Sequence, residues 1–574
     1  MKRRELMIVL LVLVGMLGSA SVATQAQGEV NPLLIVPPDL VLINGNIATV
    51  DDDFSFAQAI AIRGDTILAV GTNEEIQALA MDGTQVIDLG GKTVLPGLID
   101  GHLHGIRNGY QCYLQAVRLD DTYSRADALE MYRARAEELG PGVWIFTAGG
   151  WNVNQLDEPG MFTLAELDAV MPDNPVSIAG TGAPRQVNSK ALEVMGITED
   201  SPDPEGGQFL RDDAGHLTGA LQGASASSAL INPAINFPQY SIERQKECLS
   251  AFLRDANMRG LTSWDDSNGN DPYDPELRAI TMTRDNHSFQ AVNQLWNEGR
   301  LTARINLHMQ TYEGNEDTIR DTARSLTMFG DSMMHLAGVG EEPYGSGSGA
   351  NTDGKDFDVD EFIQRYSELT DYLAMNGFQF KHHSTSQFSN ELYLTVWEAT
   401  NAKYPITDLN WSIDHPEDTT EEQLARFKAL NVTVIPTDNL ADNEGGPPLK
   451  RMYDSGVSMC LGSDAMNVSP WPPFVNLWYA TSGHAMDPNV QGVAADQVLT
   501  REEALRSMTV KCNQLMDRDG RLGQLVAGNY ADLIVLSANY FTVPVDDIRS
   551  LTSDLTIVGG NIVFAAGDFA GMDS

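Results

Sequence analysis

Residues 93–104 read Thr93-Val94-Leu95-Pro96-Gly97-Leu98-Ile99-Asp100-Gly101-His102-Leu103-His104, a hydrophobic run that ends in two histidines. The apolar run predicts a buried strand. Side chains alternate between the two faces of a strand, so His102 and His104 point the same way and can offer two imidazoles to one metal ion. An isolated His-X-His pair also occurs at strand ends where the rings only hydrogen-bond to the backbone. The rest of the chain therefore decides between the two interpretations.

Three further stretches, 378–383, 409–415 and 457–464, place histidines or an aspartate at the ends of apolar, strand-like runs. Between the last two, residues 420–430 carry apolar side chains at helical spacing, so the local order is strand, helix, strand. A (β/α)8 barrel has this order and assembles its active site from the carboxyl ends of several strands. The sequence therefore predicts an α/β protein, a distorted (β/α)8 TIM barrel in which four strand ends converge on one site.

The two ends of the chain are rich in strand patterns. Residues 40–50 and 59–71 read as strands, and similar patterns return at 533–536 and 555–564. Neither set is long enough for a sheet domain of its own, so we expect one small composite β-sandwich made from residues 33–95 and 522–566. The barrel then occupies 96–521. Glycine-, proline- and aspartate-rich segments interrupt its rhythm at about 110–237, which predicts an insertion over the active site.

Several stretches together resemble the amidohydrolase superfamily, in the branch of amidohydrolase family 3 that contains N-substituted formamide deformylase. The resemblance runs from about residue 40 to 564 and rests on residues 94–104, Gly149-Gly150-Trp151-Asn152, 187–192, Ile413-Asp414-His415, Gly462-Ser463-Asp464-Ala465 and 528–536. It implies that His102, His104 and Asp464 bind one metal ion and that His383 and His415 bind a second. Strand periodicity does not separate His383 from His382, but the family spacing from Gly377 favours His383.

The chain departs from the family pattern in three places. Ser384-Thr385-Ser386-Gln387 stands where a Gly-Asp pair is usual, and residues 182–186 lack a histidine that is common there. Residues 334–344 lack the lysine whose carboxylated form bridges the two metals in many relatives. Glu341 is the predicted bridging ligand, because two carboxylate oxygens can reach two cations. Glu342 is the alternative, and both can instead be solvated acids, in which case the site holds one metal.

The resemblance implies a metal-dependent hydrolase in which a metal-bound hydroxide attacks a carbonyl carbon. Asp464 would take the proton of the water and pass it to the leaving nitrogen, while Trp151 and Asn152 would line the substrate pocket. Trp151 can equally be a packing aromatic. Imidazole and carboxylate ligands suit zinc. We expect hydrolysis of a non-peptide carbon–nitrogen bond in a small amide, N-substituted formamide or cyclic amide; the alternatives are a lactone or ester hydrolase, a ring-amidine deaminase and an inactive binding protein.

The other histidines, His216, His287, His308, His335 and His484, have no ligand spacing, and a structural role is the better interpretation for most of them. His308 is the exception, because it lies in an alternating, strand-like run and could point into the barrel toward the substrate. It stays outside the predicted site.

Composition and the N-terminus bear on location and partners. Three basic residues precede an apolar run at residues 6–17 and then small residues, which is a secretory signal pattern over residues 1–26. We therefore expect a secreted or periplasmic protein without a stable membrane anchor after cleavage. The net charge of −42 disfavours nucleic acid as a partner. The expected partner is a small amide-type substrate, and assembly into a homo-oligomer is left open.

The four cysteines are too few and too widely spaced for a disulfide framework. Cys112, Cys248, Cys460 and Cys512 allow three pairings, among which the sequence does not choose. Cys460 lies in the apolar run before Asp464 and is interpreted as a core residue.

Overall fold

The computed structural model describes residues 37–573 apart from 111, 149, 181–183, 205, 224–239, 271–287, 311–329, 342–357, 438–445, 466–468 and 517–518. The predicted signal segment 1–26 lies outside the described residues, as do His287, Glu342 and residues 224–237 of the predicted insertion. Residues 38–574 form one compact unit.

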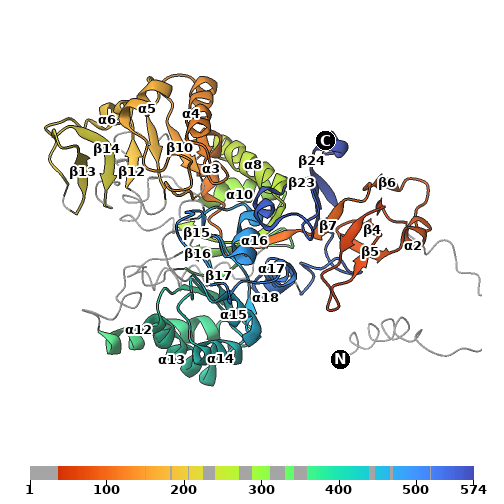
Figure 1. The fold of residues 1–574 in the computed structure, drawn as a ribbon. Coiled ribbons are helices and arrows are strands. Elements are labelled where there is room, and N and C mark those ends of the chain that lie inside the picture. The colour runs from red at the N-terminus through yellow and green to blue at the C-terminus, as the bar shows by residue number, and fades with distance from the viewer. Residues whose placement is uncertain are drawn as a thin grey trace, which may run out of the picture. The chain divides into compact units, whose positions relative to one another are not determined.

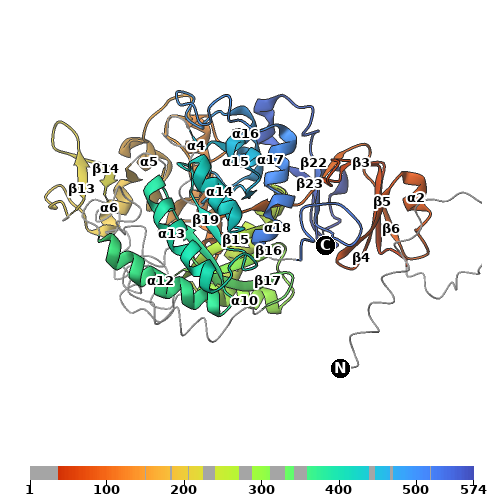
Figure 2. The ribbon, with the colours of Figure 1, turned by 90° about the horizontal axis from the view of Figure 1, so that it is seen from below.

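The centre of this unit is an eight-stranded, curled parallel sheet with helices between its strands (Figures 1 and 2). Its order is β8 (Leu98–Asp100), β15 (Leu261–Asn270), β16 (Arg304–Gln310), β17 (Met334–Val339), β18 (Gln379–His383), β19 (Ser412–Asp414), β20 (Thr433–Ile435) and β21 (Ser458–Met459). All neighbouring strands in the sheet are parallel. The predicted strand–helix alternation is therefore present, and the carboxyl ends of the strands lie at one edge.

The helices of this alternation are α8 (Ile242–Met258), α10 (Ser288–Asn297), α12 (Val359–Met375), α13 (Gln387–Lys403), α14 (Glu421–Ala429), α15 (Leu449–Ser455), α16 (Pro473–Ser482), α17 (Arg501–Ser507) and α18 (Asn513–Met516). Helix α14 has the features by which a helix can be predicted from sequence, a capping box and apolar residues at helical spacing. Thr420 and Gln423 form a capping box at its start, and Leu424 and Phe427 bury its inner face. The inner faces of α12 to α14 pack with strand residues such as Phe380 and Ile413 in one hydrophobic core.

The segments that follow the two outermost strands are hydrogen-bonded to each other. Gly101 N–H donates to Leu461 O at 2.8 Å, and Asp464 N–H donates to His102 O at 2.8 Å. Leu103 and Ala465 form a parallel bridge. These bonds bring the His-X-His segment and Asp464 to the same place, although 360 residues separate His104 from Asp464.

Strands from both ends of the chain share a sheet. Its order is β24 (Asn561–Ala565), β23 (Ser553–Val558), β22 (Leu533–Leu536), β7 (Thr93–Pro96), β2 (Asn46–Ala48) and β3 (Phe56–Ala57). A four-stranded sheet follows the order β5 (Thr66–Gly71), β4 (Ala59–Arg63), β1 (Leu40–Ile43) and β6 (Gln85–Asp88), with α2 (Asn73–Gln77) beside it. Antiparallel pairing of β22 with β7 joins the two ends. Residues of both sheets, among them Ile60 and Val535, share one buried core.

The predicted insertion contains a folded sheet rather than loops alone. Its order is β13 (Gln208–Arg211), β14 (Leu217–Gln222), β12 (Arg185–Val187), β11 (Val176–Ile178), β10 (Ile145–Ala148) and β9 (Ala116–Arg118), with helices α4 (Arg125–Leu139), α5 (Leu164–Val170) and α6 (Ser189–Met195) (Figure 1). The glycines that interrupt the pattern lie in turns. Gly215, for example, has a φ of +88° between β13 and β14, where a side chain would be strained.

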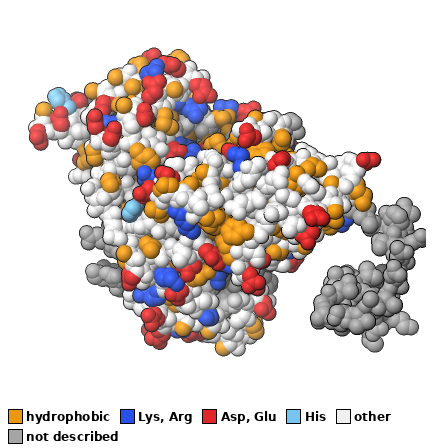
Figure 3. All heavy atoms as spheres, turned by 45° about the vertical axis from the view of Figure 1, so that its right-hand side comes forward, with side chains coloured by type: hydrophobic (Ala, Val, Ile, Leu, Met, Phe, Trp, Pro, Cys, Tyr) orange, Lys and Arg blue, Asp and Glu red, His pale blue; other side chains and the backbone are white. Residues whose placement is uncertain are grey.

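The remaining short helices connect these parts. They are α3 (Arg107–Tyr110), η2 (Tyr113–Gln115), η5 (Val510–Cys512), η6 (Val545–Ser550) and η7 (Gly567–Phe569). No helix among the described residues is long and apolar enough to cross a membrane. On the face shown in Figure 3, acidic and basic side chains are interspersed.

All four cysteines are paired, in the disulfides Cys112–Cys248 and Cys460–Cys512. The interpretation of Cys460 as only a core residue is therefore wrong, although its side chain is fully buried. The partner could not be found from the sequence because Cys512 is 52 residues away and is brought close only by the fold.

We expect replacement of Cys460 and Cys512 together by alanine to lower the free energy of unfolding by up to about 4 kcal/mol, because the open chain gains the entropy of a loop of 52 residues. Urea denaturation of both proteins under oxidising conditions measures this difference. Equal midpoints and slopes would show that the disulfide does not form in the native protein.

Candidate metal centre

Six side chains predicted as metal ligands lie together at the carboxyl edge of the parallel sheet. His102 and His104 follow β8, Glu341 follows β17, His383 ends β18, His415 follows β19 and Asp464 follows β21. Their ligand atoms form three overlapping groups within which all atoms lie within 4.8 Å of one another: His102 with His104 and Glu341, His102 with His415 and Asp464, and Glu341 with His383 and His415. The fold thus brings together every residue that the sequence predicted as a ligand.

The backbone turns sharply at two of these residues. His415 has a φ of +59° and Asp464 a φ of +52°, in the left-handed region that side chains other than glycine rarely adopt. Such strain is common where a side chain is held for function. Here both residues follow the end of a strand, and the turn directs them to the same cluster.

His102 and His104 share the carboxylate of Asp464. The distances from Asp464 Oδ1 are 3.3 Å to His102 Nε2 and 3.1 Å to His104 Nε2. The two imidazoles of the His-X-His segment therefore face one acid, as the alternation of side chains along a strand predicts.

Glu341 lies between the two histidine pairs. Its Oε2 is 3.5 Å from His102 Nε2 and 3.8 Å from His104 Nε2. Its Oε1 is 2.7 Å from His383 Nδ1 and 3.4 Å from His415 Nε2. One oxygen thus faces each pair, which is the arrangement that a bridging carboxylate requires.

The choice between His382 and His383 is clear from the geometry. His383 faces Glu341, whereas the His382 ring packs against Tyr393, with 4.1 Å between ring centroids, and against Tyr366. His382 Nδ1 is paired with the carbonyl oxygen of His383 at 2.8 Å. His382 is therefore a packing residue.

The residues fit a divalent cation. His102 is fully buried, yet neither of its ring nitrogens has a hydrogen-bond partner among the described residues, and His415 Nε2 has none either. His415 Nδ1 pairs with Thr437 Oγ1 at 2.6 Å, and Thr437 in turn donates to Glu417. Nδ1 therefore carries a proton, and Nε2 is the ring nitrogen that a metal would bind.

The electrostatics of the cluster favour the ligand forms of several residues. Burial lowers the pKa of His102 to about 3, despite opposing interactions with Glu341 and Asp464, so its ring is neutral. Burial would raise the pKa of Asp464, but the neighbouring imidazoles, His415 first, hold it well below its usual range. Burial would lower the pKa of His415, yet Asp464 and Glu341 raise it to about 10. A cation must therefore displace a proton from His415.

A buried polar group that was not predicted from the sequence lies next to this cluster, and it is formed by Lys381, Asp265 and Asp414. His308 belongs to it, since its Nδ1 lies 2.8 Å from Asp265 Oδ1 and the ring is fully buried. The one available signal was a lysine inside the apolar strand 378–383.

Trp151 and Asn152 are buried in the insertion. The Trp151 indole N–H donates to Ala179 O at 2.7 Å, its ring packs on Phe162, and Asn152 Oδ1 accepts from Asn154 N–H. None of their described contacts involves the six clustered residues. The structure thus agrees with the packing interpretation of Trp151, and a substrate-binding role for either residue stays a prediction.

The segment before Trp151 contacts the loop that carries Asp464. Gly150 N–H donates to Ser469 O at 2.9 Å, and Ser469 Oγ donates to Ser463 O. A side chain at position 150 would collide with the Ser469 backbone. The insertion is therefore anchored next to the cluster through Gly150.

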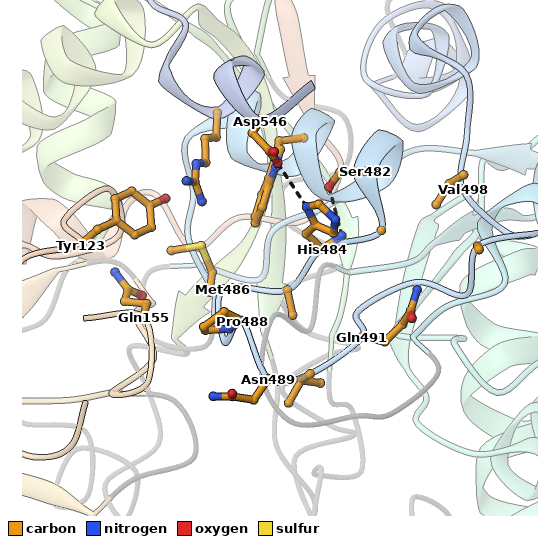
Figure 4. Close-up of a pocket in the computed structure, with 16 residues that line it drawn as sticks. Tyr123, Gln155, Ser482, His484, Met486, Pro488, Asn489, Gln491, Val498 and Asp546 are labelled. Atoms are coloured by element: carbon orange, nitrogen blue, oxygen red, sulfur yellow. Dashed lines mark hydrogen bonds and ion pairs between the residues drawn. The ribbon is translucent and has the colours of Figure 1, made fainter. Parts of the chain in front are cut away.

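A separate pocket of about 890 Å³ lies between the insertion and the C-terminal helices (Figure 4). Tyr123 and Gln155 line it from the insertion, and Trp478, His484, Asp546 and Arg549 line it from α16, η6 and the loop after α16. Asp546 accepts from Trp478 and pairs with His484, and the Arg549 guanidinium lies over the Trp478 and Tyr123 rings. None of the six clustered residues lines this pocket, so it is not part of the candidate metal centre.

A parallel α/β sheet that holds four histidines and two carboxylates together at its strand ends has the architecture of a metal-dependent hydrolase. The chain belongs to the amidohydrolase family, whose sequence model matches residues 85–564. This confirms the resemblance inferred from the motifs and makes the chain a hydrolase of carbon–nitrogen bonds, with the metal dependence that the family implies.

Known relatives agree with this assignment. The chain is 25% identical over 560 residues to N-substituted formamide deformylase of Arthrobacter pascens, covering 91% of this chain and 97% of the relative. It is 24% identical over 547 residues to a putative amidohydrolase of Bacillus subtilis, covering 91% and 98%. An uncharacterized metal-dependent hydrolase of Pyrococcus horikoshii has the same fold, with a TM-score of 0.60, 21% identity and coverage of 88% and 99%.

Proposed function

We propose that this protein is a metal-dependent amidohydrolase that cleaves a non-peptide carbon–nitrogen bond in a small amide, an N-substituted formamide or a cyclic amide. The main supporting observation is the position of Glu341, which directs one carboxylate oxygen at each of two histidine pairs. The similarity to a formamide deformylase along nearly the whole chain supports the substrate class.

In this proposal His102, His104 and Asp464 would hold one divalent cation, His383 and His415 would hold a second, and Glu341 would supply one carboxylate oxygen to each. Zinc suits these nitrogen and oxygen donors. The bound cation supplies Lewis acidity, which lowers the pKa of a water molecule and polarises a carbonyl group.

Asp464 moves the proton in this proposal. Its side chain is 15% exposed and that of His383 17%, whereas Glu341 is 5% exposed and His102 fully buried. A substrate therefore reaches the cluster from the side of Asp464 and His383. The Asp464 carboxylate, kept ionised by the neighbouring imidazoles, accepts the proton of the attacking water and delivers it to the departing nitrogen, which is a poor leaving group as an anion.

We further propose that the parallel sheet closes into a distorted (β/α)8 barrel over residues 96–521 and that the two sheets at the chain ends form one β-sandwich from 33–95 and 522–566. The bonds between the segments after β8 and β21 support the closure, and the shared core of the two end sheets supports the sandwich. The insertion at about 110–237 would cover the active site, and its anchor at Gly150 next to the Asp464 loop supports this.

We also propose that residues 1–26 are a cleaved signal peptide and that the mature protein is secreted or periplasmic. The two disulfides support this location, since disulfides persist in oxidising compartments. Determining the N-terminal residue of the mature protein tests the proposal, and an intact residue 1 would contradict it.

Removal of metal tests the proposed activity. We expect protein purified with Zn²⁺ to hydrolyse N-substituted formamides and small cyclic amides, to lose this activity after dialysis against a chelator, and to regain it with Zn²⁺. Release of amine and of carboxylic acid should be measured in parallel, with lactones, phosphoesters and ring amidines as comparison substrates. Turnover confined to a comparison class, or turnover that survives the chelator, would contradict the proposal.

A further inference from the structure

Lys381 is a fully buried cation next to the six clustered residues. It lies in the middle of β18, and its ammonium group is surrounded by oxygens from three other segments. Nζ donates to Gly101 O at 2.9 Å and to Asp265 Oδ2 at 3.1 Å, and it lies 3.3 Å from Asp414 Oδ1. An ammonium has three N–H groups; two of them are used in these hydrogen bonds, and the contact with Asp414 is an ion pair.

The ammonium group is enclosed by buried acidic side chains. Lys381, Asp265 and Asp414 are all fully buried, and Lys381 Nζ lies 3.1 Å from Asp265 Oδ2 and 3.3 Å from Asp414 Oδ1. The other oxygen of Asp265 lies 2.8 Å from His308 Nδ1. A buried ion pair is costly to desolvate and is stable only with well-placed partners, so these contacts hold the lysine in one position.

Two of the three partners of Lys381 adjoin a proposed metal ligand in the chain. Gly101 directly precedes His102, and Asp414 directly precedes His415. Asp414 Oδ2 also lies 3.5 Å from His102 Nδ1, the ring nitrogen that does not face Glu341. Lys381 itself is two residues before His383 on the same strand. One ammonium thus joins the backbone or side chains beside three of the four histidines.

We propose that Lys381 is a positioning residue of the metal centre, which fixes the His102 and His415 segments through Gly101 and Asp414. This inference rests on the metal centre of the proposed function. Groups that orient metal-binding histidines typically change metal affinity by about 10- to 100-fold when they are replaced. The ammonium contacts neither of the two carboxylate ligands in its described hydrogen bonds, so it acts through the residues that it holds.

The test is zinc affinity of the metal-free full chain, measured by competition with a fluorescent zinc chelator. We expect Lys381→Met, which keeps an unbranched side chain only one atom shorter but removes its charge and its donors, to bind zinc about 10- to 100-fold more weakly than the wild type. Lys381→Arg keeps a cation and should restore part of the affinity.

Arg304→Met is the matched control. Arg304 is also a fully buried cation in the parallel sheet and forms a two-point ion pair with Asp532, at 2.6 and 2.9 Å. It begins β16, at the end of the strand away from the cluster. We expect this variant to lose thermal stability, as Lys381→Met does, but to bind zinc with the wild-type affinity in its folded form.

Wild-type zinc affinity in Lys381→Met, or an equal loss in Arg304→Met, would overturn the proposal. If Lys381→Met does not fold, Asp414→Asn decides, because it leaves Lys381 paired with Asp265 and changes only the carboxyl group that lies between Lys381 and His102. Weaker zinc binding supports the positioning role, and unchanged binding refutes it. The zinc titration does not depend on hydrolysis. If the protein binds zinc but cleaves no amide in the activity assay, the proposed function is refuted and this inference is not affected.

Discussion

Replacement of Asp464 by asparagine is expected to lower kcat for a formamide substrate by at least about 1000-fold, because it removes the group that moves the proton from the water to the leaving nitrogen. An amide nitrogen needs that proton in order to leave, and asparagine cannot accept it. Some metal should remain bound, since the four histidines and Glu341 are intact. The measurements are kcat under saturating substrate and the zinc content of the purified variant.

Asp546→Asn is a suitable control for this variant, because it makes the same chemical change in the separate pocket (Figure 4), whose lining includes none of the clustered residues. We expect its kcat to equal that of the wild type. Wild-type turnover in Asp464→Asn would refute the assigned role. A variant that has lost all its zinc would show instead that Asp464 acts mainly as a ligand.

Five of the six clustered residues could be proposed as ligands because strand ends leave a local signal in the sequence, whereas Glu341 was proposed from the resemblance to the family. His102 and His104 have the two-residue spacing of a strand, and Asp464 follows an apolar run of strand length. Parallel strands place their carboxyl ends at one edge, so residues far apart in the chain converge without any direct signal of their contact. The pairing of β22 with β7 follows from similar local patterns at the two chain ends.

The missed features depend on contacts that no local pattern encodes. Lys381 differs from its apolar neighbours, but its partners Gly101 and Asp265 are 280 and 116 residues away. The pairing of Cys460 with Cys512 could not be predicted for the same reason, because the two cysteines are 52 residues apart. The insertion was predicted from glycine- and proline-rich interruptions, which mark turns but do not show that the strands between them, such as β9 and β10, pair into a sheet.

His382 and His383 illustrate a third case. A strand pattern alone cannot tell which of two adjacent residues faces the site when the strand ends there. The structure separates them because the aromatic side chains Tyr366 and Tyr393 provide a packing surface for His382 and leave His383 facing Glu341. Those tyrosines lie on α12 and α13, the helices directly before and after β18, and only the packing of these helices against the strand shows which histidine they cover.

Replacement of Glu341 by glutamine should change the number of bound metals. We expect the wild type to bind two zinc ions per chain and Glu341→Gln to bind one, with kcat lower by at least about 100-fold. Glutamine keeps the shape of the side chain but has one oxygen, no charge and an amide NH2 group, which cannot bind a cation. One of the two histidine pairs would then face a donor instead of a carboxylate oxygen, and the cation at that pair would lose its shared ligand.

Zinc content after gel filtration and isothermal titration of the metal-free protein measure this change. Glu398→Gln is the control, since Glu398 pairs with Arg426 on the helices α13 and α14 and is 42% exposed. It should keep two zinc ions. A wild-type protein that binds a single zinc ion would contradict the bridging role directly. If Glu341→Gln retained two zinc ions, a different carboxylate would have to be the ligand shared by the two ions. The position of the two Glu341 oxygens, one facing His102 and one facing His383, would then have no role in metal binding.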